Sequence, residues 1–502
     1  MRVVLINPNL DGSPIPNIGL AYVISSVERD HQVRLLDMVF HTGDYRRYLA
    51  ASFKEFRPEV IGFSVNSFTF HYALKIASFI RAEYPAIPLV YGGIHTSLLP
   101  EETIRNPLVD AICIGEGEDS FREYLRKLER GERPRDVAGI WYKDDTGAVV
   151  RNILRPFRED LDSLPFPNWA HWDMDRYLKT NLYFVGGIGY MFSRGCPYTC
   201  SFCSNPAMQR AIPGRFYRHR SPANIIEEIK LNRDRYASRG FRNVAFGDAT
   251  FGLNKRFLEE FCELYMGERL HLDFPWVCQT RVDVITEEWA RLVARAGCCM
   301  VTLGIESADD YIRTKVFRKT ISAEAIANAI DRLKRNDIMY AINIIIGCPD
   351  ETRESIKRVL TLLRKAKPVN TYFSFYQPLP KTELGEATRE YIVVSEDKLT
   401  KPWNTPRISV KYIKISELKR LMLRIRIAKV LKFFISGIRL KGARFIVTVI
   451  KYLFSIGGYR TMSLRNPYME VDLEQRTFYH YLLNNWRRSY LKKISQEKAE
   501  GR

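Results

Sequence analysis

Residues 196–203 read Cys196-Pro-Tyr-Thr-Cys200-Ser-Phe-Cys203, and this loop decides how the rest of the chain is interpreted. Three thiolates this close together would repel one another unless a metal or a cluster neutralised them. A structural zinc site usually takes four protein ligands from two separated pairs, and the sequence contains no second pair. Three cysteines on a [4Fe–4S] cluster leave one iron without a protein ligand. We therefore predict a reactive iron–sulfur centre in this loop.

The cysteine loop follows the first of several strand-like segments that alternate with helical stretches. The expected strands are Gly189–Ser193, Asn243–Phe246, Trp276–Gln279, Met300–Gly304, Ala341–Ile346 and Tyr372–Tyr376. Six such units over about 200 residues predict a partial (β/α)6 barrel of the TIM type, whose chemistry lies at the carboxyl ends of the strands. The cysteine loop would therefore lie at the mouth of this barrel.

The N-terminal part of the chain shows a second α/β pattern. Short apolar runs at Val3–Ile6, Val33–Asp37, Val60–Val65, Leu89–Tyr91 and Ala111–Ile114 are separated by helical stretches. This pattern predicts a parallel, Rossmann-like sheet. Ligands bind beyond the carboxyl ends of such strands, where Asn, Gly and Ser residues follow here.

The Cys-x3-Cys-x2-Cys loop, with an aromatic residue before its last cysteine, resembles the signature of the radical S-adenosylmethionine (SAM) superfamily. Further landmarks of that core occur in order between residues 185 and 385. The resemblance implies that the open iron binds SAM and that one-electron reduction cleaves SAM to a 5′-deoxyadenosyl radical. The matched residues implied to surround SAM are Phe202, Asp248, Arg281, Glu306, Ser307, Gly347 and Glu351. The chain departs from common subfamily patterns at Asp248-Ala249 and at Pro380-Lys-Thr382.

Residues 1 to about 130 resemble the cobalamin-binding domain that precedes many radical SAM cores. The resemblance rests on the segments 92–102 and 109–118 and on the first βα loop, residues 14–22. It implies cobalamin contacts from Asn7, Ser64, Gly92, Gly93, His95, Thr96, Gly115, Glu116 and Gly117. No histidine follows the Asp-x-His-x-x-Gly pattern of cobalt-ligating domains, so His95 is expected to be a polar contact and not a cobalt ligand. A domain that has lost its cofactor is the alternative.

Charge is concentrated near the C-terminus. The net charge is +20, and residues 401–460 hold fifteen Lys and Arg residues against one acid, Glu417. Three interpretations remain open for this basic, apolar region: a peripheral contact with anionic lipid, a helical cap over the barrel, or nucleic-acid binding, which lacks a recognised motif. No apolar run is long enough to span a bilayer. With no signal peptide and no disulfide framework among nine cysteines, we expect a cytoplasmic protein, with possible peripheral contact at the inner face of the membrane.

Together these patterns predict an α/β enzyme with a cobalamin-binding domain at residues 1–140, a linker at 141–184, a radical SAM core at 185–390 and a basic helical region at 391–502. The resemblance implies methylation of an unactivated carbon in a small or lipid-like substrate, with electrons from a flavodoxin- or ferredoxin-type donor. The alternatives are a radical cyclase, oxidase or carbon–carbon coupling enzyme, an RNA-modifying radical enzyme, and a non-enzymatic iron–sulfur or zinc protein. The catalytic acid or base and the substrate are left unassigned.

Overall fold

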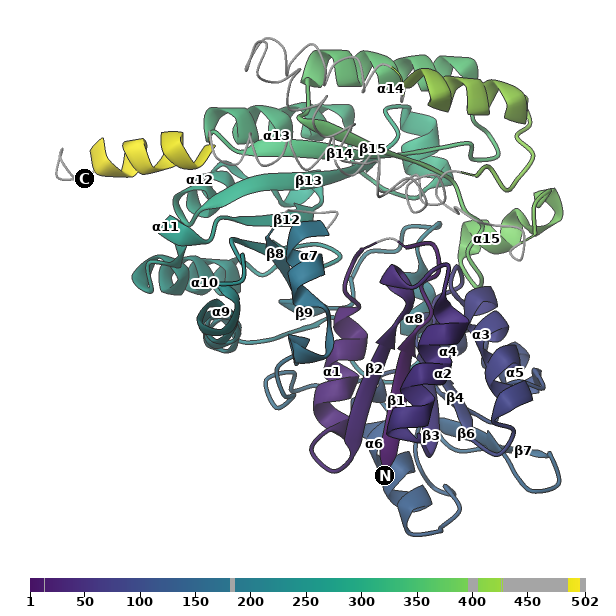
Figure 1. Cartoon of the computed structure of the whole chain (residues 1–502). Helices are drawn as coiled ribbons and strands as arrows, with labels where there is room; N and C mark the ends of the chain where they lie inside the picture. Colours follow the sequence, from purple (N-terminus) through teal and green to yellow (C-terminus); the bar gives the residue numbers. More distant parts are fainter. Residues whose placement is uncertain (13, 181–185, 396–404, 426, 428–485, 497–502) are drawn as a thin grey trace, which may run out of the picture.

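The computed structural model describes residues 1–12, 14–180, 186–395, 405–425, 427 and 486–496 (Figure 1). The first apolar runs form the five parallel strands that the sequence predicts. They are β1 (Arg2–Asn7), β2 (Gln32–Asp37), β3 (Val60–Ser64), β4 (Leu89–Gly92) and β5 (Ala111–Cys113). The sheet order is β2-β1-β3-β4-β5, so the chain crosses over between β2 and β3. This Rossmann-like arrangement confirms the predicted fold of the N-terminal domain.

Alternate residues of β1 explain why helices cover both faces of this sheet. Val3 and Leu5 pack with α1 (Ile18–Val27) and α6 (Gly117–Glu129), whereas Val4 and Ile6 pack with α2 (Tyr45–Phe56) and α3 (Phe70–Glu83). Successive side chains of a strand point to opposite faces, so a continuous apolar run is buried on both. Two short helices, α4 (Ile94–Leu98) and α5 (Pro100–Arg105), follow β4.

The first sheet continues beyond the predicted end of its domain. Strands β6 (Ile140–Lys143) and β7 (Val149–Arg151) extend it in antiparallel fashion next to β5. The segment predicted as a linker, residues 141–184, therefore begins inside this sheet. Its later part carries a short 3₁₀ helix, Trp169–His171, and the helix α7 (Met174–Thr180). We propose a domain boundary after Arg151.

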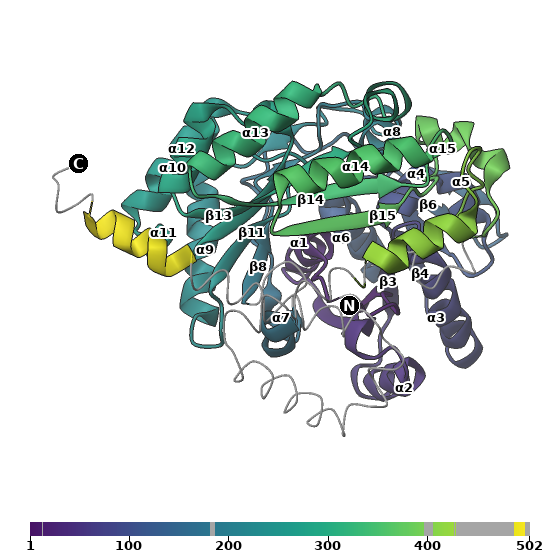
Figure 2. The same ribbon diagram turned by 90° about the horizontal axis from the view of Figure 1, so that it is seen from above.

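The second sheet consists of six parallel strands in the order β15-β14-β13-β12-β11-β8. They are β8 (Gly187–Tyr190), β11 (Asn243–Phe246), β12 (Trp276–Thr280), β13 (Cys298–Glu306), β14 (Met339–Ile346) and β15 (Asn370–Phe375). Figure 2 shows the main helices of this core along one side of the strands. They are α9 (Pro222–Tyr236), α10 (Lys255–Gly267), α12 (Glu287–Arg295), α13 (Ala323–Arg335) and α14 (Arg353–Ala366). The predicted partial barrel is confirmed.

One predicted strand has different bounds. The segment predicted as Gly189–Ser193 ends as a barrel strand at Tyr190. Ser193 instead begins β9 (Ser193–Arg194), which pairs antiparallel with β10 (Arg218–His219) in a separate two-stranded ribbon. The apolar pattern continues through Met191 and Phe192, so it gives no sign of this break. The cysteine loop therefore starts from the ribbon and not directly from the barrel.

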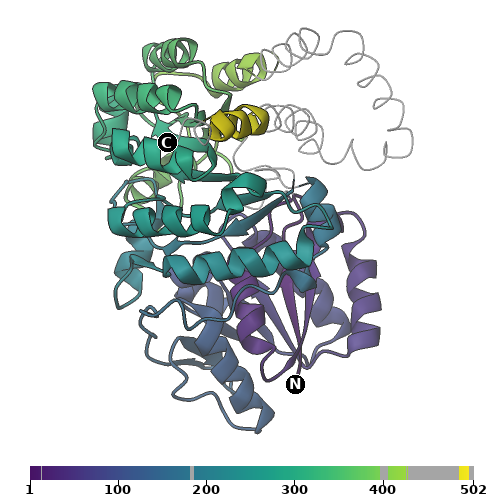
Figure 3. The same cartoon turned by 90° about the vertical axis from the view of Figure 1, so that its left-hand side faces the viewer.

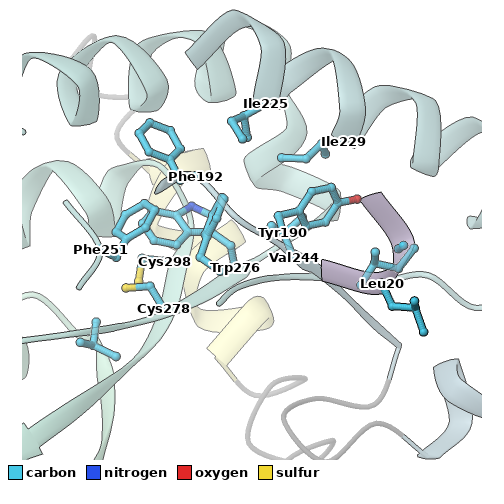
Figure 4. Close-up of a cluster of buried hydrophobic side chains, with 14 of the residues drawn as sticks. Leu20, Tyr190, Phe192, Ile225, Ile229, Val244, Phe251, Trp276, Cys278 and Cys298 are labelled. Atoms are coloured by element: carbon cyan, nitrogen blue, oxygen red, sulfur yellow. The ribbon is translucent and has the colours of Figure 1, made fainter. Parts of the chain in front are cut away.

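The apolar core runs from one domain into the other. Leu20 of α1 belongs to the same buried cluster as Tyr190, Val244 and Trp276 of the barrel, and Figure 4 shows these side chains in one view. The small residue Gly189 permits this approach, because a Cβ atom there would lie 2.9 Å from Ile18 Cδ1. The two domains thus share a packed boundary (Figure 3).

Most of the basic region that the sequence singles out, including residues 428–485, lies outside the described residues. The structure describes a helix over residues 415–425 and another over 486–496. No helix within the described ranges is long and apolar enough to cross a membrane.

Candidate active site between the two domains

The cysteine loop lies at the carboxyl end of β8, beyond the ribbon formed by β9 and β10. Cys196 is buried, and Cys200 and Cys203 are half-buried. The amide of Cys203 donates to the carbonyl of Cys200 at 3.1 Å, which closes a tight turn between the last two thiols. Cys203 then caps α8 (Ser204–Ala211), because its sulfur accepts from the Asn205 amide at 3.5 Å. All three thiols therefore come from one short, well-defined segment.

Backbone contacts from the far side of the barrel hold this loop. The Ser201 amide donates to the Phe317 carbonyl at 3.1 Å, and the Ser201 carbonyl accepts from the Leu384 amide at 2.9 Å. Phe202 packs edge-on against Phe317, with ring centroids 5.0 Å apart. Phe202 thus supports the loop from a small apolar cluster, and these contacts give it a structural role beside the predicted proximity to SAM.

The electrostatics of the three thiols favour a bound cluster. Burial, together with the neighbouring Cys200 and Cys196, raises the pKa of Cys203 to about 11. Three thiolates in one short segment need nearby positive charge, which iron supplies. Within the described ranges, no three His, Cys, Asp or Glu side chains form a site for a single metal ion. The donor set fits the iron–sulfur cluster predicted from the loop.

Two cations approach the same loop. Arg281 lies over the ring of Tyr198, 3.7 Å from its centroid, and its Nη1 is 3.9 Å from the sulfur of Cys200. Lys319 is buried, and its Nζ donates to Glu306 Oε1 at 3.0 Å. The charges of both cations act to lower the pKa of Cys200, although burial raises it overall. Arg281 was predicted from the sequence, whereas Lys319 was missed.

Lys319 lies between two barrel elements where no sequence motif marks it. The surroundings of its partner Glu306 do indicate the ion pair. Glu306 has a left-handed backbone with φ of +68°, and a Cβ on Gly304 would lie 2.7 Å from both Glu306 Oε1 and Lys319 Nζ. A glycine two residues before an acid at the end of a strand therefore leaves room for a buried ion pair. These features identify Lys319 only when the structure shows that it pairs with Glu306.

Other predicted SAM-site residues support the backbone. Both carboxylate oxygens of Asp248 are occupied: they accept from the amides of Phe192 and Ser193, and from the Ser193 hydroxyl at 2.5 Å. Burial raises the pKa of Asp248 to about 6 even though these hydrogen bonds oppose the shift. Asp248 therefore fixes the start of the ribbon that carries the cysteine loop.

Glu351 and Ser307 are engaged in a similar way. Glu351 accepts from the Gly347 amide at 3.1 Å and from the Ser355 hydroxyl, and burial raises its pKa to about 7. The hydroxyl of Ser307 accepts from the Asp309 amide at 3.1 Å. These groups shape the turns after β14 and β13. Their direct contact with SAM remains a prediction.

A cavity of about 700 Å³ lies between the two domains. The first domain contributes the predicted residues Asn7, Ser64, Gly92, Gly93, Gly115, Glu116 and Gly117 to its wall. The core contributes residues on both sides of the cysteine loop, including Met191, Arg194, Gly195, Met208 and Arg218. Predicted cobalamin contacts and residues next to the cysteine loop thus line the same cavity.

The cavity wall has the backbone geometry of a large ligand's cradle. Gly93 has φ of +104°, and a Cβ there would lie 2.4 Å from the Val65 carbonyl oxygen. Gly115 has φ of +87°. Gly62 also lines the cavity, and a Cβ there would lie 2.5 Å from a methyl of Leu5. Gly93 has no room for a Cβ, and the positive φ of Gly93 and Gly115 favours glycine, which lets backbone amides approach a ligand. The cavity therefore fits the predicted cobalamin.

Two of the predicted cobalamin contacts do not line the cavity. His95 is buried against Phe70, with ring centroids 4.1 Å apart, and its Nδ1 is 3.2 Å from the Ser67 hydroxyl. Thr96 is fully buried. Burial lowers the pKa of His95 to about 4, so its ring is neutral near pH 7. His95 thus lies outside the cavity wall, and both statements about it, that it contacts cobalamin and that it does not bind cobalt, stay predictions.

Arg194, two residues before Cys196, is bound by acids of the first domain. It pairs with Glu116 at 3.0 Å and with Glu118 at 2.7 Å. Its charge is thus neutralised by the first domain. Glu116 lines the cavity, but its carboxylate is directed to arginines of the core.

Comparisons with known proteins match this arrangement. The sequence profile of the B12 binding domain matches residues 2–125, and that of the Radical SAM superfamily matches residues 190–363. An uncharacterized methyltransferase of Pyrococcus horikoshii is 28% identical over 435 residues, which cover 84% of this chain and 91% of the relative. The anaerobic magnesium-protoporphyrin IX monomethyl ester cyclase of Rubrivivax gelatinosus is 28% identical over 407 residues, covering 78% of this chain and 71% of the relative.

A solved structure shares the whole fold. The cobalamin-dependent SAM radical enzyme OxsB, with aqua-cobalamin and SAM bound, superposes with a TM-score of 0.68 at 18% identity. The match covers 100% of this chain and 81% of that one. The two profile matches show that the chain is a radical SAM enzyme with an N-terminal B12 binding domain, whose cofactors are a [4Fe–4S] cluster, SAM and cobalamin.

Proposed function

We propose that this enzyme transfers a methyl group from SAM to an unactivated carbon of a small or lipid-like substrate. One observation carries the proposal: the glycine cradle of the first domain and the base of the cysteine loop line the same cavity. When bound, the cluster supplies the electron that cleaves SAM, and cobalamin supplies a methyl carrier. A methyl carrier next to the site of radical formation is the arrangement that methyl transfer needs.

The chain's own residues would position these groups and exclude water. Cys196, Cys200 and Cys203 hold the cluster, and Asp248 holds the backbone from which their loop begins. Arg281 and Lys319 supply positive charge beside Cys200, where the carboxylate of SAM would be stabilised. Ile18 packs on Gly189 and helps to close the domain boundary against solvent.

The products of SAM test the proposal. The enzyme is purified anaerobically, reconstituted with iron, sulfide and cobalamin, and supplied with reductant and with SAM labelled in its methyl group. Methyl transfer yields S-adenosylhomocysteine together with 5′-deoxyadenosine, and the label appears in the substrate. A radical cyclase or coupling enzyme yields 5′-deoxyadenosine without S-adenosylhomocysteine. The second outcome would replace the methyltransferase with the cyclase, which the relative from Rubrivivax gelatinosus favours.

The electron for SAM cleavage comes, in this proposal, from a small flavodoxin- or ferredoxin-type protein. A one-electron donor of low potential is what a [4Fe–4S] centre of this kind requires. Replacing chemical reductant by reduced flavodoxin should sustain formation of 5′-deoxyadenosine. A rate no higher than that without any reductant would contradict this part of the proposal.

We also propose that the basic region contacts anionic lipid, which would suit a lipid-like substrate. Its support is the charge in residues 401–460, fifteen Lys and Arg against one acid. Each cation near an anionic surface contributes about 1 kcal/mol, and this attraction weakens with salt. The full chain should sediment with anionic liposomes at low salt and less at high salt. Equal sedimentation with neutral liposomes would contradict the proposal.

A further inference from the structure

Four charged side chains join the two domains beside the cavity, and we call them the interdomain clasp: Glu116, Glu118, Arg194 and Arg218. Glu116 Oε1 accepts from Arg194 Nη1 and from Arg218 Nη2, each at 3.0 Å. Its Oε2 accepts from Arg218 Nη1 and from the amide of Arg158, each at 2.9 Å. Glu118 accepts from Arg194 Nη2 at 2.7 Å. Two carboxylates thus balance two guanidinium groups.

The two arginines come from facing positions on one ribbon. Arg194 of β9 pairs directly with Arg218 of β10, so their side chains share a face. Figure 1 shows β9 between the two sheets. The ribbon leads straight into the cysteine loop through Gly195, whose φ is +85° and where a Cβ would lie 2.3 Å from the Phe216 carbonyl oxygen. A movement of this ribbon is therefore passed to Cys196, two residues from Arg194.

The acidic half of the clasp is equally close to the cradle. Glu116 follows Gly115, which lines the cavity, and precedes Gly117, the first residue of α6. Arg194 also lies over the ring of Tyr22 on α1, 4.8 Å from its centroid. Although burial opposes it, the hydrogen bonds with Arg218 and the charge of Arg194 hold the pKa of Glu116 below its usual value. Glu116 therefore stays charged where the clasp needs it.

We propose that Glu116 is a positioning residue that fixes the separation between bound cobalamin and the [4Fe–4S] cluster. It is joined through one peptide bond to the cradle and through two arginines to the base of the cysteine loop. Both oxygens of its carboxylate accept hydrogen bonds from the arginines of the clasp and the Arg158 amide. Glu116 therefore holds the cavity residues of the first domain at a fixed distance from those of the core. The proposal concerns the placement of the cofactors and does not depend on which group the enzyme transfers.

The test compares Glu116→Gln with a matched surface variant, Glu101→Gln. Glu101 also binds an arginine with both oxygens, at 2.8 and 2.9 Å from Arg151, but this pair is exposed and lies within the first domain. Glu101→Gln should retain iron and cobalamin as the wild type does. Glu116→Gln should retain both within about twofold, because the Glu116 carboxylate is directed to Arg194 and Arg218 and not to the space of the cavity. Only Glu116→Gln should change the geometry between the two cofactors.

Electron paramagnetic resonance measures that geometry directly. In the wild type, paramagnetic cobalt(II) in cobalamin and the reduced cluster should show one defined spin–spin interaction. In Glu116→Gln this interaction should weaken and broaden, and the ratio of S-adenosylhomocysteine to 5′-deoxyadenosine should fall at least about fivefold. The spin–spin interaction tests the proposal even if the enzyme does not transfer methyl groups. An unchanged spin–spin interaction in loaded Glu116→Gln would overturn the proposal.

A second variant separates positioning from simple charge balance. Arg218→Lys keeps the positive charge but loses the two-pronged contact with Glu116. If the clasp only neutralises charge, Arg218→Lys should behave like the wild type, and that result would overturn the proposal. If Glu116 positions the loop, the spin–spin interaction should broaden again. If Glu116→Gln fails to fold, the result for Arg218→Lys decides alone. If Glu116→Gln folds and keeps its iron but loses cobalamin, Glu116 holds the cofactor itself, which would overturn the proposal.

Discussion

The two sheets of this enzyme have the same parallel architecture but build their halves of the site from different atoms. The first sheet ends in glycines, and its half of the cavity is shaped by backbone at Gly93 and Gly115. The second sheet is followed by segments with reactive and charged side chains, such as Cys196 after the ribbon and Lys319 between β13 and α13. A backbone site fails when a Cβ is added, whereas a side-chain site fails when one functional group is removed. Four substitutions test this difference.

The largest effect is expected from removing one cluster ligand. Cys200→Ala should leave no stable [4Fe–4S] cluster and no SAM cleavage, because the loop has no spare thiol. Cys299→Ala is the control: Cys299 is fully buried in an apolar cluster of the barrel and should leave the cluster intact. Iron and sulfide content, with electron paramagnetic resonance, distinguishes the two. A complete cluster in Cys200→Ala would refute the ligand assignment.

Next in size is the loss of the buried cation next to the loop. In Lys319→Met the carboxylate of Glu306 keeps no ionic partner, and breaking such a buried pair costs about 3–5 kcal/mol. The free energy of unfolding should fall by about this much, whereas Arg335→Met, which breaks an exposed pair with Glu287, should cost less than about 1 kcal/mol. Denaturant unfolding under anaerobic conditions measures both. The interpretation fails if the two variants lose equal stability.

A smaller effect is expected when a methyl group is added to the cradle. Gly93→Ala would place a Cβ against the Val65 carbonyl oxygen, and such overpacking costs about 1–3 kcal/mol. The turn must shift into the cavity, so cobalamin affinity should fall roughly tenfold. The control is Gly147→Ala, since Gly147 also has a positive φ, +82°, but has open space around it. Titration with cobalamin should show normal affinity for Gly147→Ala. If both variants lose cobalamin affinity equally, the contact with Val65 is not the cause.

The smallest effect at neutral pH is expected for His95→Gln. His95 is buried outside the cavity, so cobalamin should bind with unchanged affinity and without a histidine nitrogen on cobalt. Burial lowers the pKa of His95 from 6.5 to about 4. The unfolded chain therefore binds a proton in this range while the native chain does not, so stability falls as pH drops from 6.5 toward 4. The full shift corresponds to about 3 kcal/mol.

Removing the imidazole should flatten this pH dependence. Thermal unfolding of His95→Gln and the wild type at pH 7.5 and pH 5 gives the comparison, with His219→Gln as the matched control because His219 is only partly buried. A cobalt spectrum that changes on loss of His95 would show that the ring reaches the cofactor. An identical pH slope in both proteins would show that its titration does not affect stability.

The fold was largely predictable because both sheets are made of buried parallel strands. Continuous apolar runs such as Val60–Val65 and Ala341–Ile346 leave little choice of structure, and the glycines that follow mark the ends of several strands. The strand bounds failed at Phe192, because the apolar pattern does not change where the chain leaves the barrel for the ribbon. Strands β6 and β7 were missed because they have only four and three residues, which is too short for a periodic pattern although most of these residues are apolar.

The site was predictable where a residue acts by its own chemistry. The spacing of the cysteines predicts that they are cluster ligands, and the position of the glycines after strands predicts that they line a ligand site. Partners were not predictable: Arg194 and Glu116 are far apart in the sequence, and each alone looks like a free charge beside a cofactor. Similarly, Asp248 and Glu351 match a motif, but their hydrogen bonds to backbone amides depend on how the neighbouring turns fold.

The helix over residues 486–496 has a consequence for how the chain is synthesised. Trp486 packs against the cluster of Val277, Cys299, Met300 and Ala341, and Arg487 pairs with Asp273 at 2.9 Å. The last strand of the barrel ends at Phe375, so a translating ribosome adds about 110 residues before this covering helix emerges. At common rates of translation this takes roughly 5–20 s. During that interval the apolar surface that Trp486 covers is exposed, so the nascent chain should be most prone to aggregation at this step.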